Sequence, residues 1–455
     1  MDSESFFFEG TRCMETGDVV RAESCLKQAI QLAPDFAEAH ANLGLLLDKQ
    51  GRTADAESCY RQSIELNPSF SESHLNLGVL LAKNKRFNEA EAAYNQAISL
   101  KPHSPVAWSN MGVLLACLKR EEEAEQCYRT ALFLDESYAM ARFNLSYLLL
   151  RQGRFEEGWY CLESRNCDNA LVAHFTCPRW QGEALLNKSI VISYVAGHGD
   201  AIQFCRYVAV LKTLGAQSIT LVCHPALKIL FDVLEDVDTV ITFDEKLPES
   251  NCDFWSSLLS LPYYCNTRID SIPANIPYLH APSDLIEKWA SRLPDKTFRV
   301  GLAWKGSELF ENDAERSLPS LKILAPLWAI PGITFISLQK GSGESDSAYP
   351  PGGLKLLDLG PELHNFADTA AVISNLDMVI CVDTAVAHLT GALGKPCWVM
   401  LPEYKTDWRW LKNRPDSPWY PSAMRLFRQT TIGNWTTVVN QLADALGQLI
   451  HNAHL

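Results

Sequence analysis

The sequence predicts two architectures in one chain: an array of paired α-helices, followed by an α/β region made of two doubly wound lobes. Small, aromatic and proline residues recur every 34 residues over roughly the first 165 residues, which indicates a helical repeat. Beyond residue 188, β-branched runs of strand length alternate with helical stretches, which is typical of parallel sheets. Glycine and polar residues follow directly after several of these runs, where such folds bind ligands.

The composition favours a soluble globular protein of two or three domains. The chain has 455 residues, of which 47% are hydrophobic and 21% are charged. A formal charge of −14 and a pI near 5.3 argue against nucleic acid or an acidic membrane surface as the main partner. The start MDSESFFFEG lacks a basic leader, and no stretch reaches the roughly 18 uninterrupted apolar residues of a membrane span. We therefore expect a cytoplasmic protein without a membrane span.

Cysteines are numerous, but their pattern does not indicate metal binding or a disulfide framework. The sequence holds 14 cysteines and no CxxC pair. Most lie in apolar runs, so we expect reduced thiols packed in the core. Examples are Cys59, Cys127, Cys205, Cys223, Cys381 and Cys397.

The helical repeat is visible in four sets of residues with the same period. Each unit is predicted to be two helices joined by a short turn, with small residues that let the helices approach closely. The pattern resembles the tetratricopeptide repeat and implies a superhelix over residues 1–165, with about four and a half repeats. The sets are Gly10, Gly44, Gly78 and Gly112; Ala22, Ala56, Ala90 and Ala124; Pro34, Pro68 and Pro102; and Tyr60, Tyr94 and Tyr128.

An asparagine ladder recurs with the same period at Asn42, Asn76, Asn110 and Asn144. These amides either satisfy neighbouring backbone within the stack or bind the backbone of an extended peptide in a concave groove. In this feature the array resembles the superhelix of O-linked N-acetylglucosamine transferase, where such a ladder holds acceptor polypeptides. For His40 and His74, two positions before ladder residues, surface packing is the favoured role.

The α/β region begins after a polar connection at 166–188. The first lobe covers residues 189–297 and the second covers residues 298–455. Each is predicted to be a Rossmann-like series of strands and crossover helices. Two such lobes in sequence imply a cleft between them. The predicted strands are 189–195, 218–223 and 239–243 in the first lobe, and 298–304, 334–339, 354–360, 378–383 and 396–401 in the second.

The first predicted strand is followed by AGHGDAIQFCRY, in which Gly197 and Gly199 permit a tight turn. Asp200 stands at the start of a helix, where an aspartate commonly caps the first turn. The alternative is that its carboxylate faces the cleft and takes a proton from an attacking hydroxyl.

Basic and polar residues follow two strands of the second lobe. Lys305 and Ser307 come directly after GLAW, and Arg316 follows shortly after in ERSL. Lys305 is either a solvated loop charge or a cation that offsets charge on a departing phosphate. Gln339 and Lys340 end the next strand in the same orientation.

The stretch VDTAVAHLTGALGKP, 382–396, reads as the end of a buried strand followed by a helix. Thr384 lies at the helix N-terminus, where free amides and the helix dipole attract an anion such as a diphosphate. Asp383 would repel a phosphate, so we assign it to backbone capping or to a sugar hydroxyl. His388 lies one turn later, and it either contacts the bound ligand or packs in the core.

Taken in order, Asp200, GLAWKGS, RSL and VDTAVAHLTGALGKP make residues 188–445 resemble the family 9 glycosyltransferases, which include heptosyltransferases. The resemblance implies a GT-B fold, a nucleotide-sugar donor in the second lobe, inversion at the anomeric carbon and no metal or other cofactor. It implies that Asp200 is the base and that Lys305, Asp383, Thr384 and His388 belong to the donor site. We assign catalysis to Asp200 and Lys305, and further donor contacts to Gly199, Ser307, Arg316, Gln339 and Ala385. Relatives usually read Gln-Gly-(apolar)-Gly-Asp, whereas this chain has Ala196 and His198.

Two further motifs have a structural and a functional interpretation. Trp408, Trp410 and Trp419 are expected to wedge the lobes together, although aromatic faces also suit sugar and base rings, and Arg409 or Arg414 could reach a diphosphate. Asp236-Val-Asp238 resembles a metal-binding DxD motif, but it precedes a strand and so lies opposite the cleft.

We therefore predict an inverting glycosyltransferase that transfers a sugar from a nucleotide sugar to a Ser or Thr hydroxyl of a protein bound by the repeats. One alternative keeps the enzyme but makes the acceptor a saccharide of the lipopolysaccharide type. Another is a repeat scaffold whose α/β region has lost catalysis, which the change at Ala196 and His198 favours.

Overall fold

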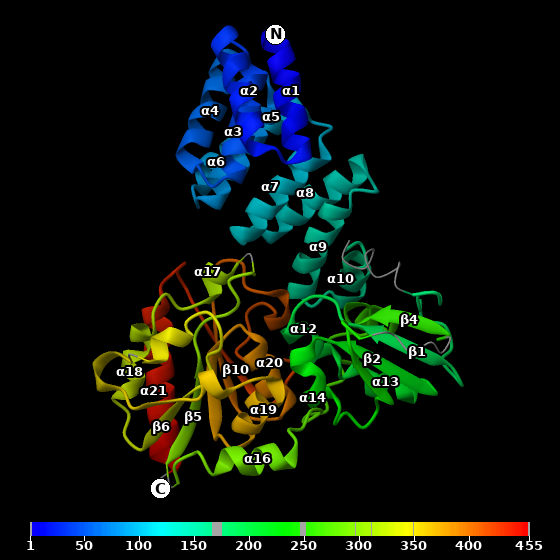
Figure 1. Cartoon of the computed structure of the whole chain (residues 1–455), viewed down its shortest axis with the longest axis vertical. Helices are drawn as coiled ribbons and strands as arrows, with labels where there is room; N and C mark the ends of the chain where they lie inside the picture. The colour runs from blue at the N-terminus through cyan, green and yellow to red at the C-terminus, as the bar shows by residue number, and fades with distance from the viewer. Residues whose placement is uncertain are drawn as a thin grey trace. The chain divides into compact units, whose positions relative to one another are not determined.

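The computed structural model of the chain describes residues 2–165, 175–245, 252–295, 297–310, 312–348 and 350–453. The chain forms two compact units, Met1–Leu148 and Leu149–Leu455 (Figure 1). The sequence division at residue 165 follows the repeat pattern, whereas the compact units divide inside helix α9 (Ala139–Arg151).

The first unit is the predicted superhelix of paired helices, stacked pair upon pair in Figure 1. The first helices of neighbouring repeats contact each other, as α3 contacts α5 and α5 contacts α7. Each second helix ends two residues before the periodic proline or its equivalent. The helices of this unit are α1 (Ser3–Thr16), α2 (Val19–Leu32), α3 (Ala37–Lys49), α4 (Thr53–Leu66), α5 (Ser71–Lys83), α6 (Phe87–Leu100), α7 (Pro105–Cys117), α8 (Glu121–Leu134) and most of α9, whereas α10 (Phe155–Leu162) belongs to the second unit.

The periodic glycines and tyrosines meet across each helix pair. A Cβ added to Gly78 would lie 2.6 Å from the ring of Tyr94, which is closer than carbon atoms can approach. The corresponding distance is also 2.6 Å for Gly112 and Tyr128, and 2.8 Å for Gly44 and Tyr60. The glycines are therefore required for the close approach of the two helices, as the sequence pattern predicted.

An ion-pair ladder with the same period joins successive repeats. Arg86 Nη1 lies 2.7 Å from the carboxylate of Glu57 in the preceding repeat, and its Nη2 lies 2.6 Å from Glu89 in its own helix. The equivalent pairs Arg52–Glu23 and Arg120–Glu91 have distances of 2.8 and 2.7 Å. These side chains are partly solvent-exposed, so each pair contributes little to stability and mainly fixes the register between repeats.

The second unit contains two fully parallel sheets, as the sequence predicted for two doubly wound lobes. The strand order is β3-β2-β1-β4 in the first sheet and β10-β9-β8-β5-β6-β7 in the second. Every run predicted as a strand contains one. The strands are β1 (Ser189–Ser193), β2 (Ser218–Cys223), β3 (Thr239–Thr242), β4 (Phe254–Ser257), β5 (Phe298–Ala303), β6 (Ile333–Ser337), β7 (Leu356–Asp358), β8 (Met378–Val382), β9 (Cys397–Leu401) and β10 (Met424–Arg428).

Strands β4 and β10 were not predicted. Both lie at an edge of their sheet, and their sequences FWSS and MRLFR are short and interrupted by polar or charged residues. In β4 the polar residues are buried and partnered, since the hydroxyl of Ser257 accepts a hydrogen bond of 2.8 Å from Arg165.

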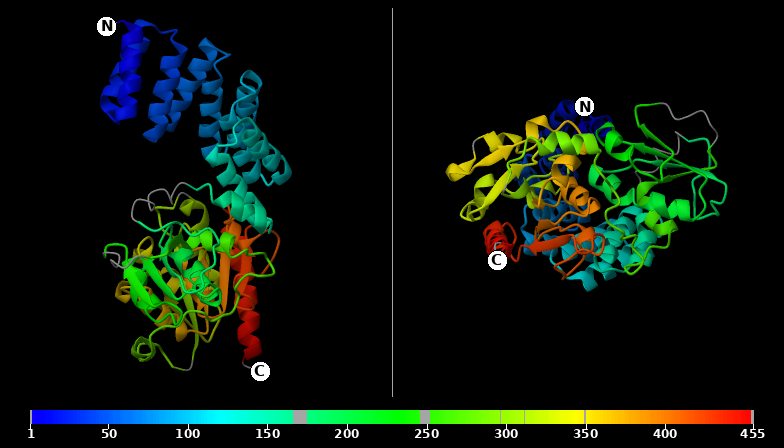
Figure 2. Two further views of the ribbon diagram at one scale, coloured as in Figure 1. Left: turned by 90° about the vertical axis from the view of Figure 1, so that its right-hand side faces the viewer. Right: turned by 90° about the horizontal axis from the view of Figure 1, so that it is seen from below.

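Helices cover the sheets and complete the core. In the second lobe, Val438, Leu442 and Leu446 of α21 (Trp435–Ala453) pack with Ile380 and Phe427 of the sheet. Figure 2 shows α21 running alongside the strands of this lobe. The other main helices are α12 (His198–Phe204), α13 (Tyr207–Thr213), α15 (Leu261–Tyr264), α16 (Ser283–Ala290), α19 (Phe366–Ser374) and α20 (Ala385–Ala392).

The tryptophan-rich segment packs the second unit together, as predicted. Trp419 is fully buried and contacts Phe155 and Trp159 of α10 and Phe204 of α12. The Trp159 indole also donates to the carbonyl of Thr267 at 3.0 Å. The last helix of the repeat pattern is therefore part of the α/β unit's core.

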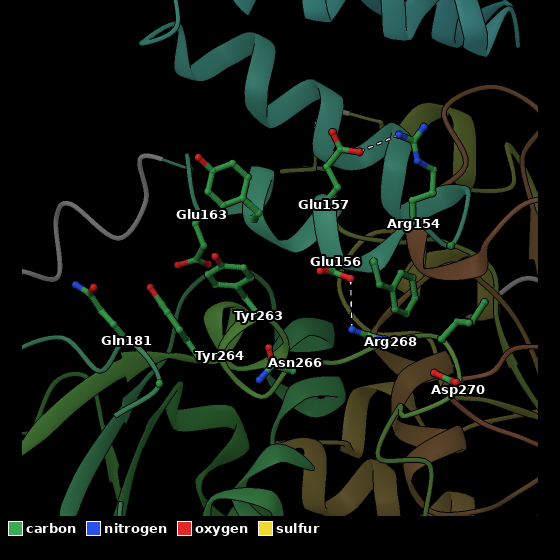
Figure 3. Close-up of a pocket in the computed structure, with 15 residues that line it drawn as sticks. Arg154, Glu156, Glu157, Glu163, Gln181, Tyr263, Tyr264, Asn266, Arg268 and Asp270 are labelled. Atoms are coloured by element: carbon green, nitrogen blue, oxygen red, sulfur yellow. Dashed lines mark hydrogen bonds and ion pairs between the residues drawn. The ribbon is translucent and has the colours of Figure 1, made fainter. Parts of the chain in front are cut away.

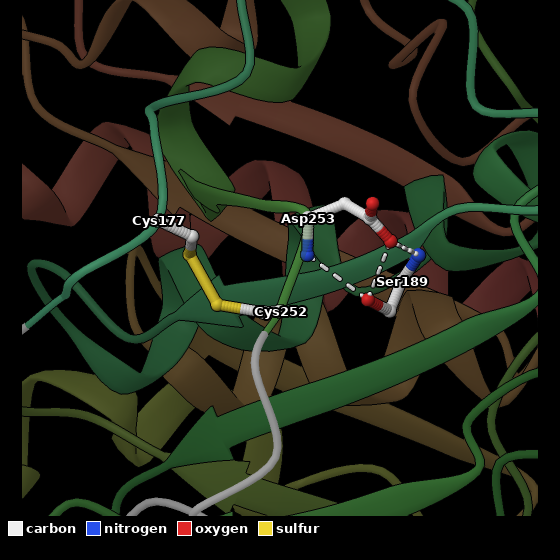
Figure 4. The surroundings of a disulfide bond; sticks show 4 residues. All are labelled: Cys177, Ser189, Cys252 and Asp253. Atoms are coloured by element: carbon white, nitrogen blue, oxygen red, sulfur yellow. Dashed lines mark hydrogen bonds between the residues drawn. A yellow bond between two sulfur atoms is a disulfide. The ribbon is translucent and has the colours of Figure 1, made fainter.

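One expectation about cysteines is wrong. Cys177 and Cys252 form a disulfide beside β4 (Figure 4), although the sequence indicated only reduced thiols. The two residues are 75 positions apart and carry no motif, and only folding brings the segment before Trp180 beside β4. The six cysteines named above from apolar runs are free thiols.

Candidate active site

Both sheets have a topological switch point, which is a pair of neighbouring strands whose connections run toward opposite edges of the sheet. It lies between β1 and β4 in the first sheet and between β5 and β8 in the second. Ligands of doubly wound sheets bind in the crevice at the carboxyl ends of such strands. Helix α12 follows β1 and α20 follows β8, so both helices begin at these positions.

The first turns of α12 and α20 pack directly against each other (Figure 1). A Cβ on Gly199 would lie 3.0 Å from Cδ2 of His388 and 3.6 Å from Cα of Ala385. Glycine at 199 thus allows the two lobes to meet here. The structure brings together six of the predicted site residues at this junction: Gly199, Asp200, Asp383, Thr384, Ala385 and His388.

Asp200 is held at the junction from both sides. Its Oδ2 accepts a hydrogen bond of 2.8 Å from the amide of Gly197, so the N-cap is Gly197 and not Asp200 as the sequence indicated, and Asp200 stabilises the helix start from the third helical position. Its Oδ1 accepts a short, charged hydrogen bond from Arg409, which comes from the other lobe. Asp200 therefore both stabilises the start of α12 and forms one half of an ion pair between the lobes.

Arg409 is the central cation of this cluster, and the sequence indicated it only as a possible diphosphate ligand. Its side chain is 10% exposed, donates to Oε1 of Gln203 at 2.7 Å, and lies 3.0 Å from Asp407. It also stacks over Trp408, with its guanidinium carbon 4.3 Å from the ring centroid. Gln203 and Asp407 were missed because neither belongs to a recognisable motif.

The N-terminus of α20 offers hydrogen-bond donors to a ligand. Thr384 is the N-cap, but its side chain does not bond to the first-turn amides. The threonine is 8% exposed, and its Oγ1 has no partner among the described residues. The amide Nε2 of the buried Gln203 is likewise unpartnered in the described part of the chain. A buried, unpaired polar atom costs about 1–3 kcal/mol, so this arrangement fits a hydrogen-bonding ligand such as a phosphate.

Asp383 precedes Thr384 and has an unusual pKa. Burial and the nearby charge of Asp407 raise the pKa of this carboxyl from 3.8 to about 6, against the opposing influence of Arg316, Trp410 and Arg409. The carboxyl is therefore mostly ionised near neutral pH, in an environment that disfavours its charge, and becomes protonated only below about pH 6.

His388 is neutral at physiological pH. Burial and the charges of three arginines hold its pKa well below the ordinary value of 6.5. Its Nδ1 lies 2.9 Å from the hydroxyl of Tyr420, and its ring stacks on Trp410 with centroids 5.2 Å apart. The histidine occupies the core position weighed from the sequence, and it also forms one wall of the junction through Gly199.

The loop after β5 holds a second group of predicted residues. Lys305 Nζ lies 3.5 Å from Asp346, and the backbone amide of Lys305 donates to Oε1 of Gln339 at 3.0 Å. Gln339 is buried and also bonds the backbone of Trp304 and Ser342, so it holds the loop rather than presenting its amide to a ligand. Within the described ranges, no hydrogen bond or ion pair joins Lys305 to Asp200.

Ser307 and Arg316 lie near this loop. Ser307 is exposed, and its Oγ accepts from the amide of Leu309 at 3.3 Å. Arg316 packs over Phe310 and lies 3.2 Å from Asp313, while its charge acts on Asp383 and His388. Arg316 thus connects the loop electrostatically with the junction.

The sequence departs from the family pattern at Ala196 and His198, and the packing of His198 explains the second change. His198 contacts the rings of His224 at 4.4 Å and Phe366 at 5.2 Å. Burial and the adjacent His224 lower its pKa to about 4, so it is neutral and packs where relatives have an apolar residue. Ala196 adopts a φ of 77°, a conformation that costs about 1 kcal/mol for a residue with a Cβ.

The DxD-like pair lies away from the junction, as the sequence predicted. Asp238 precedes β3 and accepts hydrogen bonds of 2.7 Å from Lys212 and from the amide of Ile219. Asp238 thus ties the starts of strands β2 and β3 together at the amino end of the sheet.

The asparagine ladder recurs at one position of α3, α5, α7 and α9. Asn42 donates to Thr11 at 3.0 Å, whereas the side chains of Asn76, Asn110 and Asn144 make no hydrogen bond within the described residues. His40 and His74 instead contact the carbonyls of Pro34 and Pro68 at 3.0 and 3.1 Å, which confirms a packing role.

The fold defines a repeat protein with a two-lobed α/β region, and the candidate site lies where the two lobes meet. Two families of known proteins match parts of the chain. Residues 25–58, 42–105 and 121–158 match models of the tetratricopeptide repeat, and residues 352–399 match glycosyltransferase family 9 (heptosyltransferase). The chain therefore carries tetratricopeptide repeats, followed by a segment that matches the family 9 model, spans most of β7 to β9 and includes Asp383 to His388.

Several individual proteins are similar to parts of this chain. Protein FlbA of Caulobacter vibrioides is 25% identical over 316 residues, which is 64% of this chain and 52% of that protein. The chain thus spans about half the length of this curated relative. Among solved structures, PilF of Pseudomonas aeruginosa is 19% identical and covers 37% of this chain and 80% of its own, with a TM-score of 0.34. A repeat protein of Thermus thermophilus is 20% identical and covers 38% and 95%, with a TM-score of 0.33.

No helix in the described part of the chain is both long and apolar enough to cross a membrane.

Proposed function

We propose that this protein is an inverting glycosyltransferase that transfers a sugar from a nucleotide-sugar donor to a Ser or Thr hydroxyl of a protein bound by its repeats. The observation that supports this most is the junction of α12 and α20. It places a carboxylate, Asp200, beside a helix N-terminus whose Thr384 hydroxyl is buried and unpartnered. Sugar transfer from a diphosphate needs a base and an anion site in this kind of arrangement.

In the proposed reaction, Asp200 accepts the proton of the acceptor hydroxyl. Each carboxylate oxygen has two lone pairs, so Asp200 retains acceptor capacity beside its bonds to Gly197 and Arg409. The hydroxyl oxygen then forms a bond to the anomeric carbon on the face opposite the leaving group. The bond from that carbon to the phosphate oxygen breaks, and the nucleoside diphosphate leaves with the electron pair.

The leaving diphosphate is stabilised by the first-turn amides of α20 and by the Thr384 hydroxyl. Arg316 and Lys305 supply positive charge from the loop after β5, and Arg409 supplies it from the segment after β9. With these groups we expect no requirement for a metal ion or another cofactor. Among the other donor-site residues, Ala385 gives its backbone amide and His388 forms the wall behind it.

The repeats are the proposed site for the acceptor protein. The free amides of Asn76, Asn110 and Asn144 can each donate to and accept from a peptide backbone, so binding would not depend on the peptide's side chains. We also propose a cytoplasmic location. The Cys177–Cys252 disulfide is of a kind that is rare in a reducing cytosol, so its redox state in cells tests this proposal.

The test is nucleoside diphosphate release from a panel of nucleotide sugars, with intact-mass analysis of co-purified proteins. We expect Asp200→Asn to reduce turnover by at least about 100-fold, since a positioned base contributes 10²–10⁴-fold. Asp416→Asn is the matched control, because Asp416 also pairs with an arginine of this segment, Arg414, at 2.7 Å. Equal turnover in the Asp200→Asn variant and the wild type would refute the assignment of the base.

A second candidate is a repeat scaffold that binds a nucleotide sugar without transferring it. The ion pair between Asp200 and Arg409 favours this candidate, because it neutralises the only carboxylate assigned as a base. The two candidates differ in one experiment. Binding of the nucleotide sugar without turnover for any acceptor supports the scaffold. If the protein is an enzyme, loss of acceptor labelling in an Asn76→Ala/Asn110→Ala variant shows that the acceptor is a protein and not a saccharide.

A further inference from the structure

The second unit contains a large cavity that shares no lining residue with the α12–α20 junction. Its volume is about 1320 Å³, and it lies between the start of α10 and the segment 263–270 (Figure 3). Gln181 and Gly182 line it from a third part of the chain. Such a volume accommodates several sugar rings or a short peptide.

Three tyrosines give the cavity flat aromatic surfaces. The ring centroids of Tyr263 and Tyr264 are 5.0 Å apart, and those of Tyr160 and Tyr263 are 6.3 Å apart. Tyr160 is 53% exposed although it lies on a helix whose opposite face is buried. Figure 3 shows Tyr263, Tyr264 and the Glu163 carboxylate on one side of the opening, and Arg268 and Asp270 on the other.

The charged side chains of the cavity are mostly paired with each other. Glu157 lies 2.8 Å from Arg154, and Glu156 lies 3.5 Å from Arg268. Glu163 lies 2.8 Å from Arg179, behind the cavity wall. The lining holds four carboxylates and two guanidinium groups, so the cavity has little attraction for an anionic ligand such as a nucleotide.

Neutral polar groups, by contrast, are available. The side-chain amides of Gln181 and Asn266 and the hydroxyls of Tyr263 and Tyr264 make no hydrogen bond that the structure describes. Asp270 also lacks a described partner and can accept hydrogen bonds. The cavity thus combines partly exposed aromatic rings with neutral donors and acceptors that have no partner among the described residues, beside the carboxylate of Asp270.

We propose that this cavity binds a neutral oligosaccharide. Aromatic rings pack against the apolar faces of pyranose rings, and neutral amides and hydroxyls pair with sugar hydroxyls, which both donate and accept. The inference is independent of the proposed function, because a saccharide site here would exist whether or not the junction transfers sugars.

The test is isothermal titration calorimetry of the full-length protein with maltohexaose, cellohexaose and chitohexaose. We expect at least one of them to bind, and Tyr263→Ala or Gln181→Ala to weaken that binding by at least 10-fold. Gln181 lies on an exposed loop, so its substitution does not endanger folding. Tyr147→Ala is the matched control, since Tyr147 is 41% exposed and does not line the cavity.

Two results would overturn the proposal. One is the absence of binding for all three hexasaccharides at millimolar concentration, and the other is binding that survives in a Tyr263→Ala/Gln181→Ala double variant. An octalysine peptide serves as the charged comparison, and its binding in place of the saccharides would show a polypeptide site instead. Asp200→Asn should leave saccharide binding unchanged, so failure of the proposed enzyme does not affect this experiment.

Discussion

Replacing Asp383 by asparagine tests the electrostatics of the candidate active site. In the folded protein the pKa of Asp383 is raised to about 6 by burial and by Asp407, against an ordinary value of 3.8. Above pH 6 the wild type must therefore hold an ionised carboxylate in an environment that disfavours it. Asparagine has nearly the same shape and no charge, so Asp383→Asn should remove this cost.

The expected magnitude follows from linkage between protonation and folding. Each pH unit between the two pKa values corresponds to about 1.4 kcal/mol, so the cost is at most ~3 kcal/mol at neutral pH. Because the folded-state pKa is raised, the folded form binds more protons than the unfolded form between pH 4 and pH 6. The stability of the wild type should therefore fall as the pH rises through this window, and the advantage of Asp383→Asn should appear over the same range.

Scanning calorimetry of both proteins at pH 8, 6 and 4.5 measures this difference in the transition of the second unit. We expect a higher melting temperature for the variant at pH 8, by roughly 5 °C for a unit of this size, and a much smaller gain at pH 4.5. Asp253→Asn is the control, and we expect it to lower the melting temperature at pH 8. Hydrogen bonds from Ser189 and Lys188 stabilise the ionised carboxylate of Asp253 and lower its pKa to about 2. A variant no more stable than the wild type at pH 8, or a gain independent of pH, would refute this reasoning.

Two further predictions concern packing and the disulfide. Gly78→Ala should lower the melting temperature of the repeat unit, because overpacking against Tyr94 costs about 1–3 kcal/mol and exceeds the helix propensity of about 1 kcal/mol that alanine adds. Circular dichroism measures this, Tyr94→Leu in the same chain should restore part of the loss, and an unchanged melting temperature would contradict the close contact. Cys252→Ser should destabilise the second unit by about 2–4 kcal/mol, since Cys177 and Cys252 close a loop of 75 positions. Calorimetry of the oxidised wild type and the variant measures this loss, and identical transitions would show that the disulfide does not constrain the chain.

Much of the fold follows from local patterns. The period of 34 residues predicted the helix pairs. The structure shows why glycine recurs with this period, because a Cβ at position 78 would collide with the ring of Tyr94. Eight of the strands were predicted because their sequences are apolar or β-branched runs of strand length. Strands β4 and β10 escaped prediction because their short sequences mix apolar with polar or charged residues and so resemble loops.

The candidate site was predicted only in part. The motifs around Asp200 and Thr384 identified two ends of strands, and the two helices do meet there. The partner of Asp200 could not be identified, because Arg409 is more than 200 positions away and lies in a segment whose tryptophans indicated packing. The roles assigned to Lys305 and Ser307 stay predictions.

The sequence by itself determined the periodic array, the two series of parallel strands and the polar residues at strand ends, because each of these depends on neighbours along the chain. Only the tertiary structure decided which polar residues meet. The Asp200–Arg409 pair, the raised pKa of Asp383 and the Cys177–Cys252 disulfide all depend on contacts between distant segments. Burial and charge act through space, so these properties become defined only when the lobes pack together.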